Sequence, residues 1–264
     1  MNRRLIHPLS VLLSGVWLVL ASVMLHASEL SPEARWIKAI DNDDTATIHA
    51  MVDALATLQP PMPKPDIVTT ASGTGKTAFM IACKTDDLAL AKKLHRLGAD
   101  VHRSTNTGGT PFMYASLGNS QSIAEYLLSF DVDIDAQGSN GWSAATIAAA
   151  KGYTDMLAYL LTIGVDANAP DVYQWSPLMR AADNRHYAAV ERLLKTSSIK
   201  LDTQSDTGNT ALHIAAANGD SRMIKLLLDA GSDPGIANAQ GVIPVQLVAG
   251  LPNGEMLTSL FESD

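Results

Sequence analysis

The segment GTGKT at residues 73–77 contains the glycine, lysine and threonine that a phosphate-binding loop uses. Such a loop reads G-x-x-x-x-G-K-[ST], follows a buried strand and holds phosphates with its backbone amides. Thr70 occupies the position of the first required glycine, and Pro63 and Pro65 precede the segment where a strand is needed. We therefore predict no nucleotide site here and interpret Thr77 as the cap of a helix.

The acidic run DVDID at residues 131–135 could offer carboxylates to a calcium ion. A calcium loop of the EF-hand type needs a glycine at its sixth position and a glutamate at its twelfth. Counted from Asp131, these positions hold Ala136 and Trp142, so the run meets neither requirement. We interpret its aspartates as turn residues and predict no metal site.

Cysteine and histidine are the other residue types that could carry catalysis. The single cysteine, Cys83, falls where small residues recur and is expected to be buried; alone it can form neither an intrachain disulfide nor a multi-cysteine zinc site. The seven histidines show no His-x-His or His-Glu-x-x-His spacing, and the chain contains no GxSxG elbow. The sequence leaves a Ser–His–Asp arrangement of distant residues untested. We predict no catalytic residues, no cofactor and no enzyme activity.

The composition excludes several classes of protein. Of 264 residues, 47% are apolar and 17% are charged, which excludes a disordered chain and a polytopic membrane protein. Aromatic residues make up only 5%, which favours close packing of helices over a β-sandwich core. The formal net charge of −8 argues against nucleic acid as a partner, because phosphate binding requires excess positive charge.

Residues 1–27 predict an export signal. They contain no Asp or Glu, begin with Arg3 and Arg4, and continue into a mostly apolar run over residues 9–25. This order is typical of a secretory signal peptide, and we expect cleavage after Ala27. The alternative is an uncleaved N-terminal membrane anchor, because the apolar run is long for a signal and Leu25 suits the cleavage site poorly. Both interpretations predict a periplasmic or secreted protein, with no membrane span left after cleavage.

A heptapeptide recurs along most of the remaining chain. Its copies read TAFMIAC, TPFMYAS, SAATIAA, SPLMRAA, TALHIAA and IPVQLVA, and they begin at Thr77, Thr110, Ser143, Ser176, Thr210 and Ile243. Consecutive copies start 33 or 34 residues apart. The period and the heptapeptide resemble the ankyrin repeat, whose signature is T-P-L-H-x-A. The resemblance implies an all-α solenoid of helix-turn-helix units joined by β-hairpin loops, with five clear repeats over residues 73–241.

The residues within each unit supply physical reasons for this fold. A Ser or Thr at the helix start caps the first-turn amides, and Leu-Leu pairs form an apolar stripe that only neighbouring units can bury. Gly98, Gly164 and Gly231 end the second helices, where a left-handed residue is favoured, and Asp131 replaces this glycine in the second unit. The fourth unit, LLKTSSIKLD, lacks the glycine and carries an extra residue, so we expect a longer loop there. The resemblance also implies that His213 braces neighbouring backbone.

The two ends of the stack differ from its inner units. Residues 28–72 are expected to form an N-terminal capping unit and a connecting loop, because two short helical patterns are followed by a segment with four prolines. Residues 242–264 are expected to form a shortened C-terminal capping unit. A stack with capped ends has no need to self-associate, so we expect a monomer.

In such a stack the hairpin tips and the ends of the first helices are free to vary, and a partner protein would bind there. Trp142 and Trp175 have the same register on adjacent hairpins, with Tyr173 beside them, and such aromatic residues are frequent anchors of protein interfaces. The alternative is that each tryptophan only covers its own hairpin. The predicted partner-binding residues are Lys76, Asn140, Trp142, Lys151, Tyr173, Trp175, Asp183 and Asn184.

The resemblance implies a non-catalytic module that binds another protein outside the cytoplasm. One role is support of a partner such as an oxidative-stress enzyme, as in exported bacterial ankyrin-repeat proteins linked to catalase. The alternative is an immunity protein that neutralises a toxin directed at the cell envelope. A third role, an effector secreted into a host cell, fits less well, because such a protein is expected to lack a cleavable signal of this kind.

Overall fold

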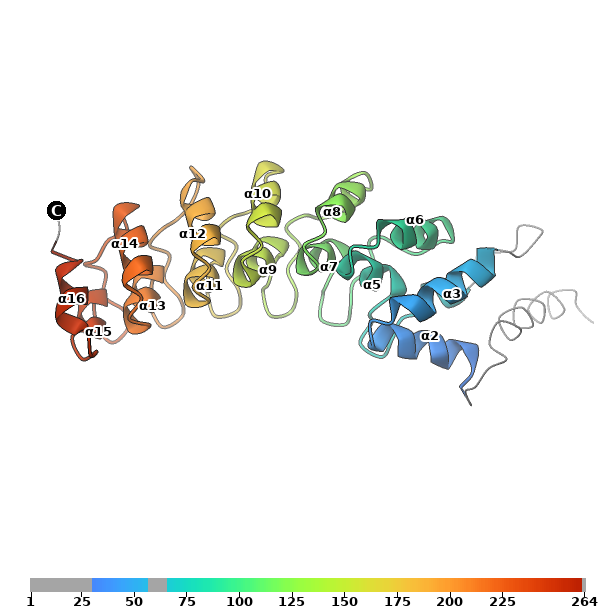
Figure 1. The fold of residues 1–264 in the computed structure, drawn as a ribbon, viewed down its shortest axis with the longest axis horizontal. Helices are drawn as coiled ribbons and strands as arrows, with labels where there is room; N and C mark the ends of the chain where they lie inside the picture. Colours follow the sequence, from blue (N-terminus) through green and yellow to red (C-terminus); the bar gives the residue numbers. More distant parts are fainter. Residues whose placement is uncertain (1–29, 57–65, 263–264) are drawn as a thin grey trace, which may run out of the picture. The chain divides into compact units, whose positions relative to one another are not determined.

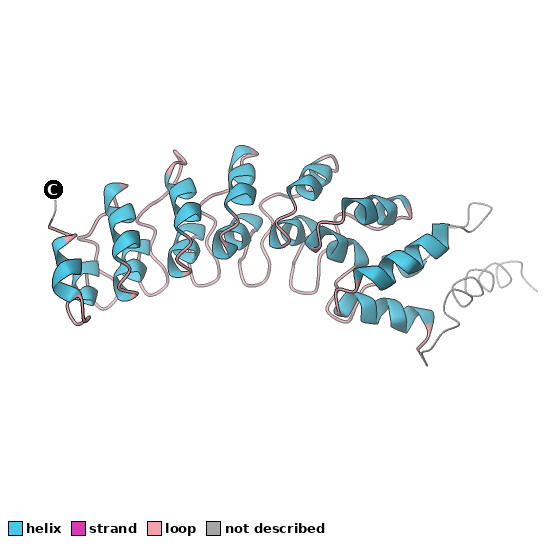
Figure 2. Cartoon of the chain, in the orientation of Figure 1, coloured by secondary structure: helices cyan, strands magenta, loops and turns pink. Residues whose placement is uncertain are grey.

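The computed structural model describes residues 30–56 and 66–262, and all regular elements in these ranges are helices (Figures 1 and 2). The all-α fold class is therefore confirmed. None of these described helices is long and apolar enough to cross a membrane. The predicted signal peptide lies outside the described residues. The chain divides into two compact units, the first ending at Val132 and the second beginning at Asp133.

In the first unit α2 packs against α3, α5 against α6 and α7 against α8, and the first helices α5 and α7 also pack against each other. Thr77 and Thr110 start α5 and α7, because their hydroxyls accept hydrogen bonds from the amides of Met80 (3.3 Å) and Met113 (3.2 Å). The caps predicted from the heptapeptide are confirmed. The helices of this unit are α2 (Pro32–Asp41), α3 (Thr45–Ala56), α4 (Asp66–Thr69), α5 (Ala78–Lys84), α6 (Leu88–Arg96), α7 (Pro111–Leu117) and α8 (Gln121–Leu128).

The short helix α4 lies in the segment that we predicted to be a connecting loop. The prolines precede residue 66, so they leave the following turn free to be helical. The turn is closed by the Thr69 hydroxyl, which donates to the carbonyl of Asp66 at 2.8 Å, and it buries Ile67 and Val68. Burial of these two apolar side chains stabilises a turn that the local sequence alone would not hold.

In the second unit the first helices α9, α11, α13 and α15 lie side by side, and each packs against its following second helix (Figure 1). Ser143, Ser176 and Thr210 cap the first three of these helices. His213 contacts Thr210 through Nδ1 (2.9 Å to Oγ1) and the carbonyl of Val242 through Nε2 (3.0 Å), which confirms its bracing role. The helices are α9 (Ala144–Lys151), α10 (Thr154–Thr162), α11 (Pro177–Asp183), α12 (Tyr187–Leu194), α13 (Ala211–Ala217), α14 (Ser221–Asp229), α15 (Pro244–Val248) and α16 (Gly254–Ser259).

The core of both units consists of small and aliphatic side chains. Alanines of the heptapeptides are buried and keep the first helices of neighbouring repeats close together. Each Leu-Leu pair contributes one fully buried side chain and one that is half-buried, so the apolar stripe is narrower than the sequence suggested. The fully buried members are Leu127, Leu160, Leu193 and Leu227.

The turns that follow the second helices use left-handed residues. Gly98, Gly164 and Gly231 have φ values of 104°, 91° and 93°, as the glycine positions predicted. Asp131, at the same register, adopts φ 54° and so replaces glycine at a conformational cost. In the fourth repeat the chain leaves α12 without a left-handed residue at positions 195–200, and the Ile199 amide donates to the Thr196 carbonyl at 3.0 Å.

Candidate functional site

Six hairpin loops connect the repeats, each closed by a backbone hydrogen bond across its base, with no strand in the described residues. In the second unit, neighbouring tips are also joined. The Val172 amide donates to the Asn140 carbonyl at 3.2 Å, and the Asp206 amide donates to the Tyr173 carbonyl at 3.0 Å. The six hairpins span residues 72–76, 105–109, 138–142, 171–175, 205–209 and 238–242.

Asp171 organises the hairpin at residues 171–175. Its carboxylate Oδ1 accepts hydrogen bonds from the amides of Tyr173 (2.9 Å) and Trp175 (3.0 Å). Its Oδ2 accepts from the guanidinium of Arg180, at 2.9 Å from Nε and with a second contact from Nη2. The Asp171 side chain has no exposed surface and that of Arg180 is 19% exposed. The hairpin is therefore built on a buried, charge-assisted contact.

The guanidinium of Arg180 lies between two aromatic rings. Its central carbon is 4.5 Å from the ring centre of Trp175 and 5.4 Å from that of Trp142. Both distances lie within the range of cation–π attraction. We refer to Trp142, Asp171, Trp175 and Arg180 as the stacked cluster.

The stacked cluster changes the interpretation of the two tryptophans. Trp142 and Trp175 are brought together as their register predicted, and both are half-buried against Arg180, so neither ring is freely exposed. The exposed apolar residues at the tip are Val172 and Tyr173, 54% and 58% exposed. The expectation that each tryptophan only covers its own hairpin is also incomplete, because both rings contact one arginine.

The remaining predicted residues occupy three places. Asn140 is exposed at a hairpin tip, where its Oδ1 accepts a hydrogen bond from the Trp142 amide at 3.1 Å. Lys151 is exposed at the end of α9, and Asp183 and Asn184 are exposed at the end of α11. Lys76 belongs to the first unit, where its Nζ lies 3.4 Å from the carbonyl of Asp41.

Sequence reasoning missed Asp171, Val172 and Arg180. A signal was present in the repeat register, because position 171 corresponds to Ser, Thr, Gly or Asn in the other hairpins. Arg180 likewise stands where three other repeats carry isoleucine. Two departures of opposite charge, nine residues apart, could have indicated an ion pair. Their burial could not be deduced from the register alone.

The residues that could have carried other chemistry have structural roles instead. Gly75 has φ 83° at a hairpin turn and Thr77 caps α5, as our interpretation of GTGKT required. Burial raises the pKa of the Cys83 thiol, which keeps it protonated. No group of three or more His, Cys, Asp or Glu side chains is placed to bind a metal in the described part of the chain.

The aspartates of the DVDID run also hold turns. Asp133 Oδ1 accepts the amide of Asp135 at 3.0 Å, and Asp135 Oδ1 accepts the amide of Asp166 at 2.8 Å. The second contact joins successive repeats of the second unit. These carboxylates therefore act as backbone acceptors in the turns.

The sequence matches the family model for ankyrin repeats (3 copies) over residues 38–138, 130–205 and 163–238. It is 40% identical over 70 residues to the tyrosine-protein kinase HTK16 of Hydra vulgaris, which is 26% of this chain and 9% of the kinase. It is 44% identical over 50 residues to the regulatory protein SWI6 of Kluyveromyces lactis, 19% of this chain and 6% of that protein. The chain thus spans less than a tenth of these relatives.

Two solved structures resemble the fold over most of their own length. The human ASB11 ankyrin repeat domain aligns with a TM-score of 0.70 and 23% identity, covering 87% of this chain and 98% of that one, and this likeness shows the fold alone. A chain from the complex of the predatory endopeptidase Bd0816 of Bdellovibrio bacteriovorus with the immunity protein Bd3460 aligns with a TM-score of 0.62 and 26% identity. That match covers 71% of this chain and 98% of that one.

Proposed function

Because the chain belongs to the ankyrin-repeat family, whose stacks present extended binding surfaces, we propose that it binds a partner protein through the hairpins of the second unit. The contact surface consists of Val172, Tyr173 and Asn140 at the tips, with Trp142 and Trp175 behind them. Lys151, Asp183 and Asn184 form its polar edge. Binding, without catalysis by this chain, is the function we assign to it.

The observation that carries this proposal is the stacked cluster beneath an exposed tyrosine. Asp171 binds the amides of Tyr173 and Trp175, and Arg180 contacts both indole rings, so the tip is ordered before a partner arrives. An aromatic side chain on an ordered support loses little conformational entropy on binding. Tyr173 therefore serves as the main contact, and the tryptophans position it.

Of the two finer roles expected from the sequence, one has a supporting observation. The fold and 26% of the aligned residues are shared with a chain from an endopeptidase–immunity protein complex. We therefore favour an inhibitor that neutralises an envelope-directed enzyme or toxin. Support of an oxidative-stress enzyme remains a prediction. Deletion of the gene separates the two, because loss of an immunity protein causes self-toxicity and loss of a stress-support protein causes peroxide sensitivity.

We place this activity in the periplasm or outside the cell, on the basis of the signal-like pattern at residues 1–27. Cell fractionation with mass spectrometry of the N-terminus tests this. A chain beginning at Ser28 in the periplasm supports it, an intact N-terminus in the membrane fraction supports the anchor alternative, and a cytoplasmic chain contradicts both.

The binding surface is tested by capture of partners from the periplasmic fraction, followed by affinity measurement with the purified partner. Tyr173→Ala is expected to weaken binding by about ten-fold or more, as central aromatic anchors do. Met256→Ala is the matched control, since Met256 is a similarly exposed apolar residue of the same unit but lies on α16. Equal effects of the two variants, or none from Tyr173→Ala, would remove the hairpin tip from the interface.

A further inference from the structure

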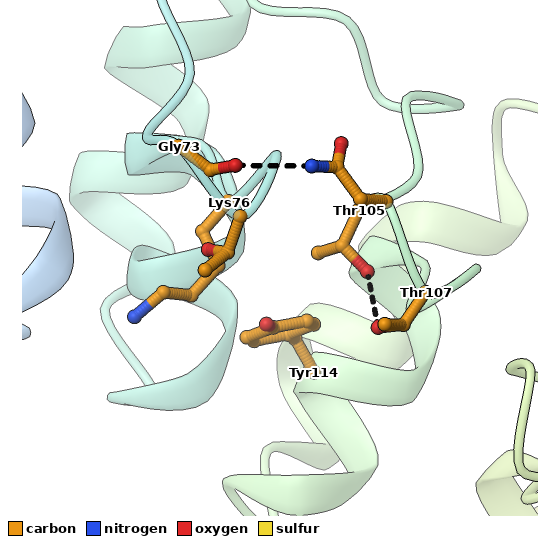
Figure 3. A pocket seen from close by; sticks show the side chains of 7 residues that line it. Gly73, Lys76, Thr105, Thr107 and Tyr114 are labelled. Atoms are coloured by element: carbon orange, nitrogen blue, oxygen red, sulfur yellow. Dashed lines mark hydrogen bonds between the residues drawn. The ribbon is translucent and has the colours of Figure 1, made fainter.

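An open hollow of about 440 Å³ lies in the first unit between the hairpins at residues 72–76 and 105–109. The ring of Tyr114, from α7, forms its floor, with Lys76 on one side and Thr107 on the other (Figure 3). The two hairpins are joined at their tips, where the Asn106 side-chain amide donates to the Gly73 carbonyl at 3.0 Å and the Asn106 backbone amide donates to the Thr74 carbonyl at 3.0 Å. We refer to this feature as the Tyr114 hollow.

The repeat register shows why this hollow is open. Tyr114 occupies the same position in its repeat as Arg180 does in the fourth, four residues after the capping residue. Arg180 is covered by tryptophans from its own hairpin and from the preceding one. Over Tyr114 the corresponding residues are Gly109 and Lys76, so neither position supplies an aromatic ring to stack on it.

Tyr114 is the one aromatic residue among those that line the hollow. The Tyr114 ring is half-buried and its edge lies close to Gly109, because a Cβ atom at that glycine would be 3.3 Å from Cε2 of the ring. An incoming aromatic ring would supply the stacking partner that the fourth repeat takes from its own tryptophans. Such ring pairs contribute beyond the area that they bury.

One cationic side chain lines the hollow. Lys76 is its one charged lining residue, and its ammonium contacts the carbonyl of Asp41 but no carboxylate within the described residues. The nearby Asp43 is already paired with Lys84, whose Nζ lies 2.5 Å from Oδ2. Burial and the charge of Asp43 raise the pKa of Tyr114, so the floor of the hollow is a neutral phenol at neutral pH.

We propose that the Tyr114 hollow receives an aromatic side chain of the partner protein that is followed directly by an acidic residue. The ring stacks on Tyr114, and the carboxylate pairs with the ammonium of Lys76. This second contact site rests on the proposed function, since it requires a protein partner. It uses different residues, in the other unit, from the surface around Tyr173.

Three capped dipeptides test the site without the natural partner: N-acetyl-Phe-Asp-amide, N-acetyl-Phe-Asn-amide and N-acetyl-Phe-Lys-amide. Each is titrated into the ¹⁵N-labelled protein, as purified from cells, and followed by amide chemical shifts. We expect shifts centred on residues 105–107 and 114, with affinity falling from the Asp to the Asn to the Lys probe. The step from Asp to Asn is expected to be about two- to five-fold, as for a solvent-accessible ion pair.

Two variants separate the contributions of ring and charge. Tyr114→Ile installs the residue that three other repeats carry at this register, so the fold is retained while the aromatic floor is lost, and all three probes should bind more weakly. Lys76→Met should bind the Asp and Asn probes equally. Tyr153→Ile, which removes a half-buried tyrosine of the second unit outside the proposed contact surface, is the matched control and should leave the titrations unchanged.

Three results would overturn the assignment: no saturable shifts around Tyr114, an unchanged affinity in Tyr114→Ile, or an Asp probe that binds Lys76→Met as tightly as the original chain. Because the probes are free dipeptides, these results do not depend on whether a partner is captured. Failure of the Tyr173→Ala test with the natural partner, by contrast, would count against the proposed function and leave the probe titrations standing.

Discussion

The hairpins at residues 171–175 and 205–209 are closed by the same backbone hydrogen bond across their bases, but different side chains accept hydrogen bonds from their other amides. In the second of them the Ser205 hydroxyl accepts the Asn209 amide at 3.2 Å, and nothing charged is involved. In the first, the Asp171 carboxylate binds two amides and still has an oxygen left for Arg180. The difference shows that the residue at one position of the repeat decides whether the hairpin is held by a neutral hydrogen bond or by a carboxylate that also binds an arginine.

The consequence of that difference extends beyond the turn. Burial of a carboxylate costs free energy that hydrogen bonds and a cationic partner offset, and Arg180 supplies the cation from the position that Ile214 fills in the next repeat. The arginine, in turn, gives both tryptophans a surface to stack on. The pair of charges therefore determines where two large aromatic residues lie.

The largest loss of stability should come from removing the carboxylate of Asp171. Asp171→Ala leaves a mostly buried guanidinium without its partner and two hairpin amides without an acceptor, and is expected to lower the free energy of unfolding by about 3–5 kcal/mol. Ser205→Ala, at the matching position, removes one neutral hydrogen bond and should cost about 1 kcal/mol. Urea unfolding followed by circular dichroism measures both variants. Equal losses of unfolding free energy in the two variants would show that the Asp171 carboxylate stabilises its hairpin no more than the Ser205 hydroxyl stabilises the next one.

A smaller effect on stability is expected when both charges are replaced together. Asp171→Ser with Arg180→Ile restores the pattern of the neighbouring repeat, and the double variant should unfold within about 1.5 kcal/mol of the original chain, since an apolar replacement of a buried ion pair is often neutral. Near-ultraviolet circular dichroism should nevertheless change, because Trp142 and Trp175 lose the guanidinium between them. An unchanged tryptophan spectrum would mean that the rings are held by other contacts.

The smallest predicted effect is on the ionisation of Tyr114, which stands in its repeat at the position that Arg180 holds in the fourth repeat. Burial raises its pKa above the ordinary value of 10.0, so ultraviolet titration should contain a tyrosine that ionises late and that Tyr114→Ile removes. Because the folded-state pKa is the higher one, the stabilising contribution is complete below pH 10, the unfolded-state value, and is lost as pH rises through the higher folded-state pKa. The absorbance change that Tyr114→Ile removes should therefore lie above pH 10, and a lost phenol that ionises at its ordinary pKa would contradict the burial of this ring.

The repeat period allowed much of this molecule to be predicted. These features depend on contacts within one repeat or with the next repeat: the caps at Thr77 and Thr110, the left-handed glycines and the brace at His213. The register also placed Trp142 and Trp175 on adjacent hairpins. It gave no measure of their exposure, because the residue that covers them departs from the repeat pattern.

The sequence by itself determined the helical stack, since a period of 33 or 34 residues with caps and apolar stripes can bury its core in few other ways. Only the tertiary structure decided which varied positions are covered and which are open. Arg180 and Tyr114 share a register, yet one is covered by two indoles and the other is the floor of a hollow. Which of the two occurs depends on side chains contributed by two consecutive hairpins, and packing between hairpins is a property of the folded chain.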